Sequence, residues 1–204
     1  LVAPSRLAAA IAHLAALGVF GPVVITVLAT FLGLGLGLLP VFLIGVVFLL
    51  ALVYLIYGVG WFETARVDGL YGFGLPARAL RTSGRPGFGG FLRSLWMQLT
   101  DPWSWRGVAN FTIATILGGI VIALAGISAS GAVLAFAPLF ADGQSVPLVR
   151  TGLDVPIAWA VPVGIMAALL GLAAIVGCGI LHGVLSRAIM VPSREVQLTE
   201  AART

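Results

Sequence analysis

Charged side chains are scarce in this chain. They make up only 9% of its 204 residues, whereas 60% of the residues are hydrophobic, and the mean hydropathy is +1.14. A soluble globular domain keeps a much larger charged fraction on its water-facing surface. The composition therefore excludes an ordinary soluble domain and predicts an integral membrane protein.

Lysine is absent and cysteine occurs once. All eleven basic residues are arginine, and the net charge of +4 is spread along the chain. This dispersed charge lacks the clustered basic patch that nucleic-acid binding requires, so we expect no nucleic-acid partner. The single Cys178 excludes an internal disulfide and is interpreted as a small packing residue.

Histidine is nearly as rare. His13 and His182 lie near the predicted inner ends of their helices, and neither has a carboxylate close by in the sequence. Because zinc prefers three or four ligands, these residues predict no metal site, no cofactor and no catalytic site. We interpret both histidines as packed or solvated at the membrane boundary, with a response of His182 to cytoplasmic pH as the alternative.

The chain contains long runs without a charged residue. A span needs about 20 apolar residues, and the sequence offers four such segments, separated by glycine, proline and polar breaks, at 14–37, 40–62, 107–137 and 156–186. None contains an acidic residue or an arginine, which disfavours an ion or proton carrier. We predict an all-α integral membrane fold, a four-transmembrane-helix bundle that forms a single domain over 1–204.

The segment 63–106 carries most of the charge. Its centre, "RTSGRPGFGG", has the composition of a loop, and the residues after it place apolar side chains on one face of a helix. A helix too short to span and apolar on one face is typical of the membrane surface. We predict an amphipathic interfacial helix between the second and third spans, with its face formed by Phe88, Phe91, Leu92, Leu95, Trp96 and Leu99.

The arginines also predict the orientation. Six lie in 63–106, three in the tail 187–204 and one at Arg6, against Arg150 alone in the predicted outer loop 138–155. Because short loops rich in arginine stay in the cytoplasm, we expect both termini and the segment 63–106 to be cytoplasmic. The predicted location is the cell (plasma) membrane, which the chain crosses several times.

The outer loop is too short to fold into a ligand-binding domain. We interpret it as a solvated connector, and as a stimulus-contacting loop in the alternative. Its polar residues are Asp142, Gln144, Arg150 and Asp154. A stimulus would then be met in or at the membrane, as lipid packing, an amphiphilic antibiotic or a neighbouring membrane protein.

The stretch "LTDPWSWRGVANFTIATILGG" begins the third span. Asp101 followed by Pro102 is a helix-start signal, Trp103 and Trp105 are suited to the headgroup level, and Arg106 to the inner end of the span. We interpret the motif as an anchor that sets the depth of the span. The alternative adds coupling of the surface helix to the third span.

This stretch resembles the Asp-Pro-x-Thr-Trp-Arg-Asp-hydrophobic-Ala-Tyr motif of the putative sensor domain family of actinobacterial membrane proteins. The positions that match are Asp101, Pro102, Trp105, Arg106 and Ala109. Ser104 replaces the threonine, while Gly107 and Asn110 depart from the family's Asp and Tyr. The resemblance implies a four-helix input module that commonly precedes a histidine kinase in a two-component system.

We therefore expect a non-catalytic sensory module that controls a histidine kinase fused or bound to it. No phosphoacceptor histidine segment or nucleotide pocket occurs within the 204 residues. The expected partners are membrane lipids and a kinase domain or another membrane protein, and the pairs Gly33/Gly37 and Gly179/Gly183 suit packing within the bundle or a homodimer. The alternatives are an accessory or structural subunit of a larger membrane complex, such as an ABC transporter, and a membrane enzyme, for which no convergent polar group is visible.

Overall fold

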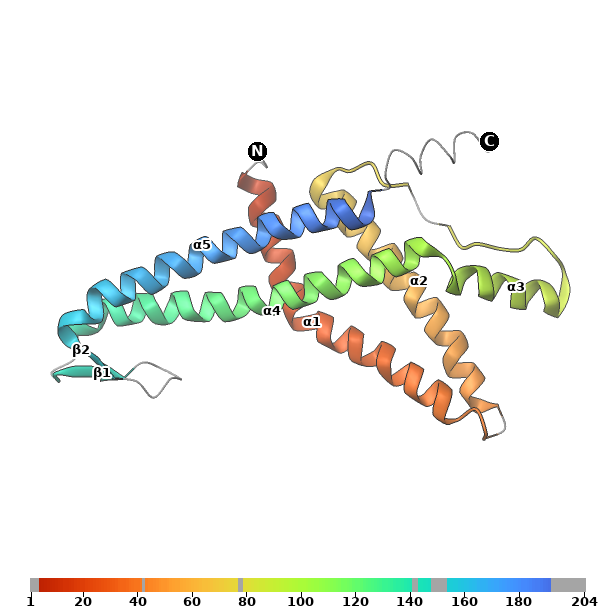
Figure 1. Cartoon of the computed structure of the whole chain (residues 1–204), viewed down its shortest axis with the longest axis horizontal. Helices are drawn as coiled ribbons and strands as arrows, with labels where there is room; N and C mark the ends of the chain where they lie inside the picture. Colours follow the sequence, from red (N-terminus) through yellow and green to blue (C-terminus); the bar gives the residue numbers. More distant parts are fainter. Residues whose placement is uncertain (1–3, 42, 77–78, 141–142, 148–153, 192–204) are drawn as a thin grey trace. The chain divides into compact units, whose positions relative to one another are not determined.

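The computed structural model describes residues 4–41, 43–76, 79–140, 143–147 and 154–191. Five α-helices dominate it (Figure 1): α1 (Pro4–Gly37), α2 (Ile44–Tyr71), α3 (Gly87–Leu99), α4 (Pro102–Phe136) and α5 (Ile157–Met190). A 3₁₀ turn, Ala137–Leu139, follows α4. The two short strands are β1 (Ser145–Pro147) and β2 (Asp154–Pro156).

Helices α1, α2, α4 and α5 are each long and apolar enough to cross a membrane. Most of their side chains are apolar around the whole circumference, as expected of helices that face lipid rather than water. The predicted fold class is confirmed, and the chain is a multi-pass membrane protein. The orientation and the domain limits remain predictions.

Helix α2 continues well beyond residue 62, where the sequence predicted the second span to end. Its last residue is Tyr71, and Gly72 then adopts a left-handed conformation (φ 63°) in which its N–H donates to the carbonyl of Asp68. Glycine reaches this conformation without steric cost, which makes it a good helix terminator. Glu63 and Arg66 therefore lie on a helix and not in an irregular aqueous segment.

The connection between α4 and α5 contains a small hairpin that the sequence did not predict. β1 and β2 pair antiparallel, with Val146 opposite Val155, and the Ile157 N–H donates to the Gln144 carbonyl. Strands of three residues that end in proline carry no readable alternation, so periodicity could not reveal them. Gln144 and Asp154 lie on this hairpin, whereas Asp142 and Arg150 lie outside the described residues.

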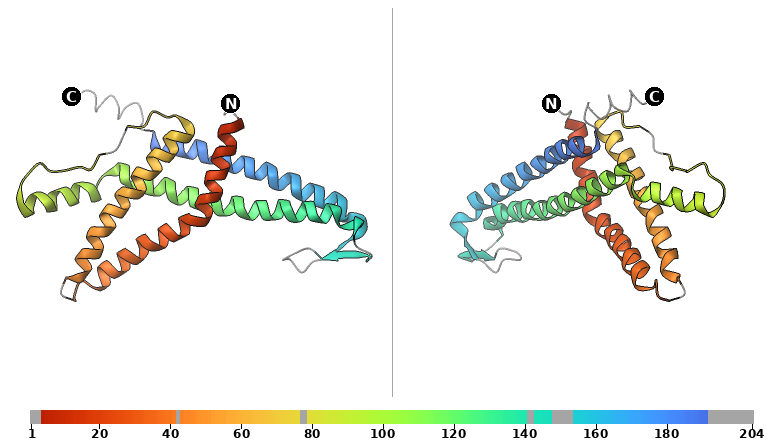
Figure 2. Two further views of the ribbon diagram at one scale, coloured as in Figure 1. Left: turned by 180° about the vertical axis from the view of Figure 1, so that it is seen from behind. Right: turned by 45° about the vertical axis from the view of Figure 1, so that its right-hand side comes forward.

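The chain divides into two compact units. Unit 1 comprises 1–18 and 116–181, and unit 2 comprises 19–115 and 182–204. In unit 1 the C-terminal part of α4 and the N-terminal part of α5 run antiparallel, side by side (Figures 1 and 2). Glycines allow this approach, because a Cβ on Gly131 would lie 2.7 Å from the Ala168 nitrogen and one on Gly164 would lie 2.5 Å from the Ala135 nitrogen.

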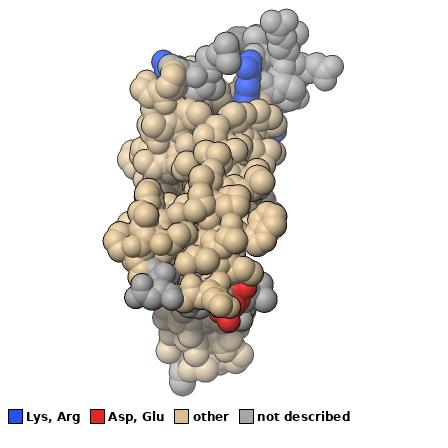
Figure 3. All heavy atoms as spheres, turned by 90° about the vertical axis from the view of Figure 1, so that its left-hand side faces the viewer, with Lys and Arg blue, Asp and Glu red and all other residues tan. Residues whose placement is uncertain are grey.

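The surface of these helices is almost uniformly apolar. Figure 3 shows a broad area without charged side chains, and large side chains such as Leu169, Leu170 and Ile120 are between 43% and 63% exposed. An exposed apolar surface of this extent marks a membrane or protein contact. It agrees with burial of the helices in lipid.

In unit 2, helix α3 lies beside α2. Its polar side faces inward, since Gly90 and Gln98 are buried and Ser94 Oγ donates to the Gly90 carbonyl and accepts from the Ser83 N–H. The predicted apolar face is outward, with Phe88 and Trp96 73% and 65% exposed. This arrangement is the one an interfacial helix needs, because the outward face is available to lipid.

Candidate functional site

A buried cluster of polar side chains joins α2, α4 and α5 within unit 2. It consists of Glu63, Arg66 and Tyr71 from α2, Asn110 from α4, and His182 and Ser186 from α5. All are buried except the half-buried Tyr71. Burial of polar groups is unfavourable unless they are hydrogen-bonded, so such a cluster in a membrane helix is a candidate functional site.

The centre of the cluster is a two-pronged ion pair on one helix. Arg66 Nε donates to Glu63 Oε2 at 2.8 Å and Arg66 Nη2 donates to Glu63 Oε1 at 2.6 Å. The two side chains are three residues apart, which places them on the same face of α2. Their exposed fractions are 3% and 0%, so the pair is shielded from water. Its opposite charges neutralise each other, which lowers the cost of burial.

His182 connects this pair to α5. Its Nε2 lies 3.1 Å from Arg66 Nη2 and 3.2 Å from Ser186 Oγ, and its Nδ1 lies 2.7 Å from the Tyr71 hydroxyl. Because a guanidinium can only donate, Nε2 must accept from Arg66, and the proton of a neutral ring then lies on Nδ1. This assignment makes His182 a donor to the Tyr71 oxygen. One imidazole thus bonds to two points of α2 separated by more than a helical turn.

Asn110 connects the pair to α4. Its Nδ2 donates to Glu63 Oε1 at 2.5 Å, so this carboxylate oxygen accepts from both Arg66 and Asn110. Close by, Gly60 and Gly107 bring α2 and α4 together, since a Cβ on Gly107 would lie 2.6 Å from the Gly60 Cα. Asn110 is one of the two positions that depart from the family motif, and its side chain is what joins α4 to the cluster.

Two polar atoms of the cluster form no hydrogen bond in the described structure. Within the described part of the chain, Arg66 Nη1 and Asn110 Oδ1 are buried and have no hydrogen-bond partner. A buried donor and acceptor that lack partners destabilise the arrangement in which they occur. Each of these two atoms can form a further hydrogen bond, with water or with another polar group.

The three helices contribute at the same depth. Glu63 precedes the α2 end at Tyr71 by eight residues, Asn110 follows the α4 start at Pro102 by eight, and His182 precedes the α5 end at Met190 by eight. At 1.5 Å per residue the cluster lies about 12 Å inside these ends. It sits just inside the predicted inner boundary of the membrane.

The sequence interpretation of these residues is corrected here. Glu63 and Arg66 were assigned to an aqueous or interfacial segment, and His182 was considered isolated from carboxylates and packed or solvated. The structure buries all three and places Arg66 between the histidine and Glu63. The missed signal was the three-residue spacing of Glu63 and Arg66. The equal distance of Glu63, Asn110 and His182 from their helix ends became visible only once α2 was known to extend to Tyr71.

Local hydrogen bonds and an ion pair hold the predicted motif Asp101–Arg106 at the start of α4. Asp101 is buried, its Oδ2 accepts from Ser104 Oγ at 3.1 Å, and its Oδ1 lies 3.4 Å from Arg81 Nη2. Pro102 is the first residue of α4. The Trp105 indole N–H donates to the Leu99 carbonyl at 2.7 Å, so the motif bonds to the last residue of α3 as the coupling interpretation requires.

Arg106 links the motif to the C-terminal end of α5. Its guanidinium lies 5.7 Å from the centre of the Trp103 ring, within the range of a cation–π contact. It also lines a hollow of about 610 Å³ whose other walls are Arg187, Ala188, Ile189 and Val191. The motif and the segment that leads into the tail therefore share one surface.

Two further sequence predictions concern metal ligands and the glycine pairs. Among the residues described, no three His, Cys, Asp or Glu side chains are grouped closely enough to hold a metal ion. A Cβ added at Gly33 or Gly37 would have no atom of another described residue within 4 Å. A Cβ added at Gly179 would contact Leu7 and Ile11, and one added at Gly183 would contact Tyr71. The second glycine pair therefore packs against neighbouring side chains, and use of the first pair in a homodimer remains a prediction.

Comparison with known proteins gives one result. The sequence profile of the family described as "Putative sensor" matches residues 13–190. No curated protein and no solved structure matches the chain. The matched range takes in all four apolar helices, the start of α4 and the polar cluster, and it supports a sensing or input role for this arrangement. The chain belongs to the Sensor family of membrane proteins.

Proposed function

We propose that the chain is the input module of a plasma-membrane signalling system and controls a histidine kinase fused or bound to it. The observation that carries this proposal is the polar cluster, which joins α5 to α2 through His182 and joins α2 to α4 through Glu63. A stimulus that changes the packing of α2 must break or remake these bonds. The change then passes along α5 to Arg187 and the tail.

The mechanism requires two helix arrangements that differ in stimulus affinity. A ligand that binds both equally shifts nothing. In the arrangement seen here, Arg66 donates to both Glu63 and His182. The second arrangement would bring partners to Arg66 Nη1 and Asn110 Oδ1, at the expense of the Arg66–His182 bond. Bonds of comparable strength on both sides keep the two states close in free energy.

A reporter fusion tests this route. The chain is joined at Thr204 to a histidine kinase core, and one to seven alanines are inserted after Arg187. If α5 transmits a rotation or tilt, kinase output should vary with helical phase and return near insertions of four and seven residues. Output that is the same for every insertion length would contradict transmission through α5.

The same reporter tests the cluster. Glu63→Gln keeps the shape of the side chain and removes the charge that holds Arg66, so we expect output to become locked in one state. Gln98→Glu changes the charge of a buried residue on α3, outside the cluster. It serves as the control for general damage to the fold. An accessory subunit would instead co-purify stably with transporter subunits, and none of these substitutions would change kinase output.

Helix α3 is proposed to contact anionic lipid at the inner leaflet. Its exposed apolar face has Arg85 and Arg93 beside it, and basic residues next to an amphipathic helix are attracted to anionic headgroups. Trp96 fluorescence should be quenched by lipids brominated near the headgroup, and Trp96→Phe should remove that component. Quenching only by lipids brominated deep in the acyl chain would contradict the surface position.

A further inference from the structure

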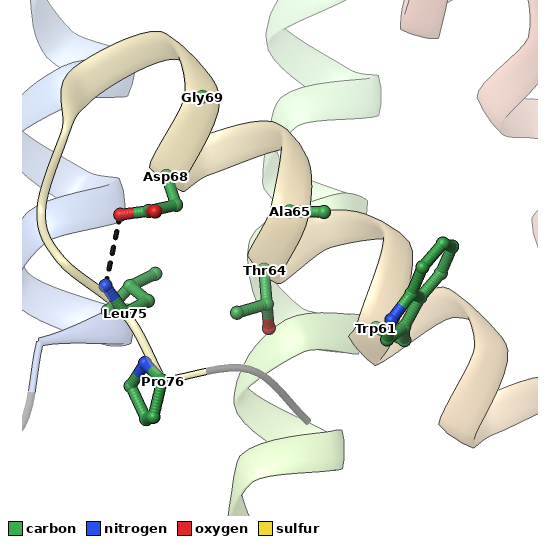
Figure 4. Close-up of a pocket in the computed structure, with 7 residues that line it drawn as sticks. All are labelled: Trp61, Thr64, Ala65, Asp68, Gly69, Leu75 and Pro76. Carbon is green, nitrogen blue, oxygen red and sulfur yellow. Dashed lines mark hydrogen bonds between the residues drawn. The ribbon is translucent and has the colours of Figure 1, made fainter. Parts of the chain in front are cut away.

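A second face of α2 forms a hollow that the polar cluster does not use. Figure 4 shows it between α2 and the segment that follows, lined by Trp61, Thr64, Ala65, Asp68, Gly69, Leu75 and Pro76. Its volume is about 410 Å³, which is in the range of pockets that bind small molecules. All of the lining belongs to unit 2.

The hollow is held open by a bond from its own carboxylate. Asp68 Oδ1 accepts from the Leu75 N–H at 3.0 Å (Figure 4), while the Asp68 carbonyl accepts from the Gly72 N–H at the end of the helix. These two bonds turn the chain back along α2 and bring Leu75 and Pro76 beside Asp68. The pocket is thus built by local structure.

The polar atoms of the lining are mostly acceptors. Thr64 Oγ1 donates its proton to the Gly60 carbonyl at 2.7 Å, which leaves only lone pairs for other contacts. Asp68 forms no ion pair with any described residue and uses one oxygen for Leu75. The seven described residues of the lining include no arginine or histidine, although arginines are the commonest charged residues of this chain.

The apolar part of the hollow lies at a fixed distance from the carboxylate. Trp61 is 52% exposed and is seven residues from Asp68 on the same face of α2, which corresponds to about 10 Å along the axis. Trp61 lies toward the apolar part of α2, and Asp68 lies near its end. A molecule that reached both would place a charged head near the helix end and an apolar body toward the membrane.

We propose that this hollow binds an amphiphile with an ammonium head, with Asp68 pairing the cation and Trp61 packing on the apolar body. An indole face also attracts a cation that approaches it. An anionic amphiphile would meet the Asp68 carboxylate and the Thr64 hydroxyl oxygen, and within the described lining the Trp61 indole N–H is the single side-chain donor left to it. The site therefore selects cations over anions of the same length.

Binding at this face would act directly on the polar cluster. Thr64 and Ala65 in the hollow lie between Glu63 and Arg66, which point to the opposite side of the same helical turn. A ligand wedged between α2 and Leu75 displaces the turn that holds the Glu63–Arg66 pair. The binding site stands independently of the proposed function, while its role as the stimulus site rests on that function.

The test uses the full chain in nanodiscs of digalactosyldiacylglycerol, a neutral lipid without an ammonium group, with empty nanodiscs to subtract partitioning. Octylammonium, octanoate and octanol share one chain length and differ in the head group. We expect saturable binding of octylammonium by calorimetry, weaker binding of octanol and no saturable binding of octanoate. Equal binding of octylammonium and octanoate would overturn the proposal.

Two variants with matched controls locate the site. Asp68→Asn keeps an oxygen for the Leu75 N–H and loses the charge, so octylammonium affinity should fall about tenfold or more. Asp154→Asn, an exposed carboxylate on β2, should leave it unchanged. Trp61→Ala should weaken binding about fivefold, and Trp159→Ala, with a 64% exposed ring on α5, should not. Wild-type affinity in Asp68→Asn would also overturn the proposal.

Replacing half of the lipid with phosphatidylethanolamine distinguishes two sources of the ammonium group. Weaker octylammonium binding in these nanodiscs identifies a lipid headgroup as a competitor for the same site, and unchanged binding identifies free amines as its ligands. In the reporter fusion, octylammonium should change kinase output in the wild type and not in Asp68→Asn. Saturable binding without any change in output would refute the signalling role and leave the site intact.

Discussion

The two units solve the problem of holding apolar helices together in different ways. In the described part of unit 1, Ser128 is the single buried polar side chain, and its hydroxyl has no hydrogen-bond partner there. α4 and α5 touch instead through Gly131 and Gly164. In unit 2 the buried polar side chains include a carboxylate, a guanidinium and an imidazole that bond to one another.

The difference concerns how strongly each unit fixes the relative position of its helices. Close packing of small residues is favourable but has little directional preference. Hydrogen bonds between charged groups require particular distances and angles. The bonds of unit 2 therefore define the relative position of its helices more narrowly than the glycine contacts of unit 1 do. Under the proposed function, the bonds that a stimulus would change lie in unit 2.

The largest expected effect comes from removing one member of the ion pair. Glu63→Ala leaves the Arg66 guanidinium buried without its counter-ion, and such a loss costs about 3–5 kcal/mol. The free energy of unfolding, measured by denaturant titration in detergent micelles, should fall by that amount. Asp154→Ala, at an exposed carboxylate of unit 1, should change it by less than about 0.5 kcal/mol. Equal effects of the two variants would remove the contrast between the units.

Unit 1 should be sensitive to volume at its glycine contact. Gly164→Ala places a methyl group 2.5 Å from the Ala135 nitrogen, and overpacking of this kind costs about 1–3 kcal/mol. Gly177→Ala on the same helix meets no atom within 4 Å among the described residues and serves as the control. Both are measured by the same unfolding titration. A Gly164→Ala protein as stable as Gly177→Ala would show that the helices do not depend on this contact.

A double-mutant cycle measures the directional bonds of unit 2. Glutamine at His182 can still accept from Arg66 but cannot reach Tyr71, so His182→Gln and Tyr71→Phe remove the same bond. Each should cost about 1 kcal/mol, and the double variant should cost about 1 rather than 2. Tyr54→Phe, at a 48% exposed ring of α2, should instead add independently to His182→Gln. Additivity of the Tyr71 pair would mean that the bond contributes nothing.

The smallest effect is expected at the start of α4. Trp105→Phe keeps the ring and loses the N–H bond to the Leu99 carbonyl, which is exposed, so the free energy of unfolding should fall by about 0.5 kcal/mol. Hydrogen exchange in 96–100 should rise more clearly, because the end of α3 loses its link to α4. Trp103→Phe preserves the ring beneath Arg106 and should change neither. Faster exchange in both variants would point to a general loosening.

Much of the fold follows from the sequence, because apolar runs, glycine and proline breaks and a one-sided apolar pattern are local properties. They predicted four spans and the surface helix at Phe88–Leu99, and the Asp101–Arg106 motif predicted the family. The polar cluster did not follow, since it depends on which faces of α2, α4 and α5 meet. Asn110 and Ser186 carry no signal of their own until those faces are known.

The binding hollow beside Asp68 was missed for a related reason. Its shape depends on the chain reversal after Gly72 and on the Asp68 bond to the Leu75 N–H. The sequence placed Asp68 in a charged aqueous segment, where a carboxylate needs no explanation. Recognition that α2 extends to Tyr71 would have placed Trp61, Thr64, Ala65 and Asp68 on one helical face.

The pairing of Glu63 with Arg66 has one further consequence. A single charge moved through the membrane potential does electrical work of about 2.3 kcal/mol per 100 mV, but this pair carries no net charge and sits on one helix. When α2 shifts, the work done on the carboxylate cancels the work done on the guanidinium. A rigid shift of α2 therefore does no net electrical work on this pair, and membrane voltage acts on it only when the carboxylate and the guanidinium move separately.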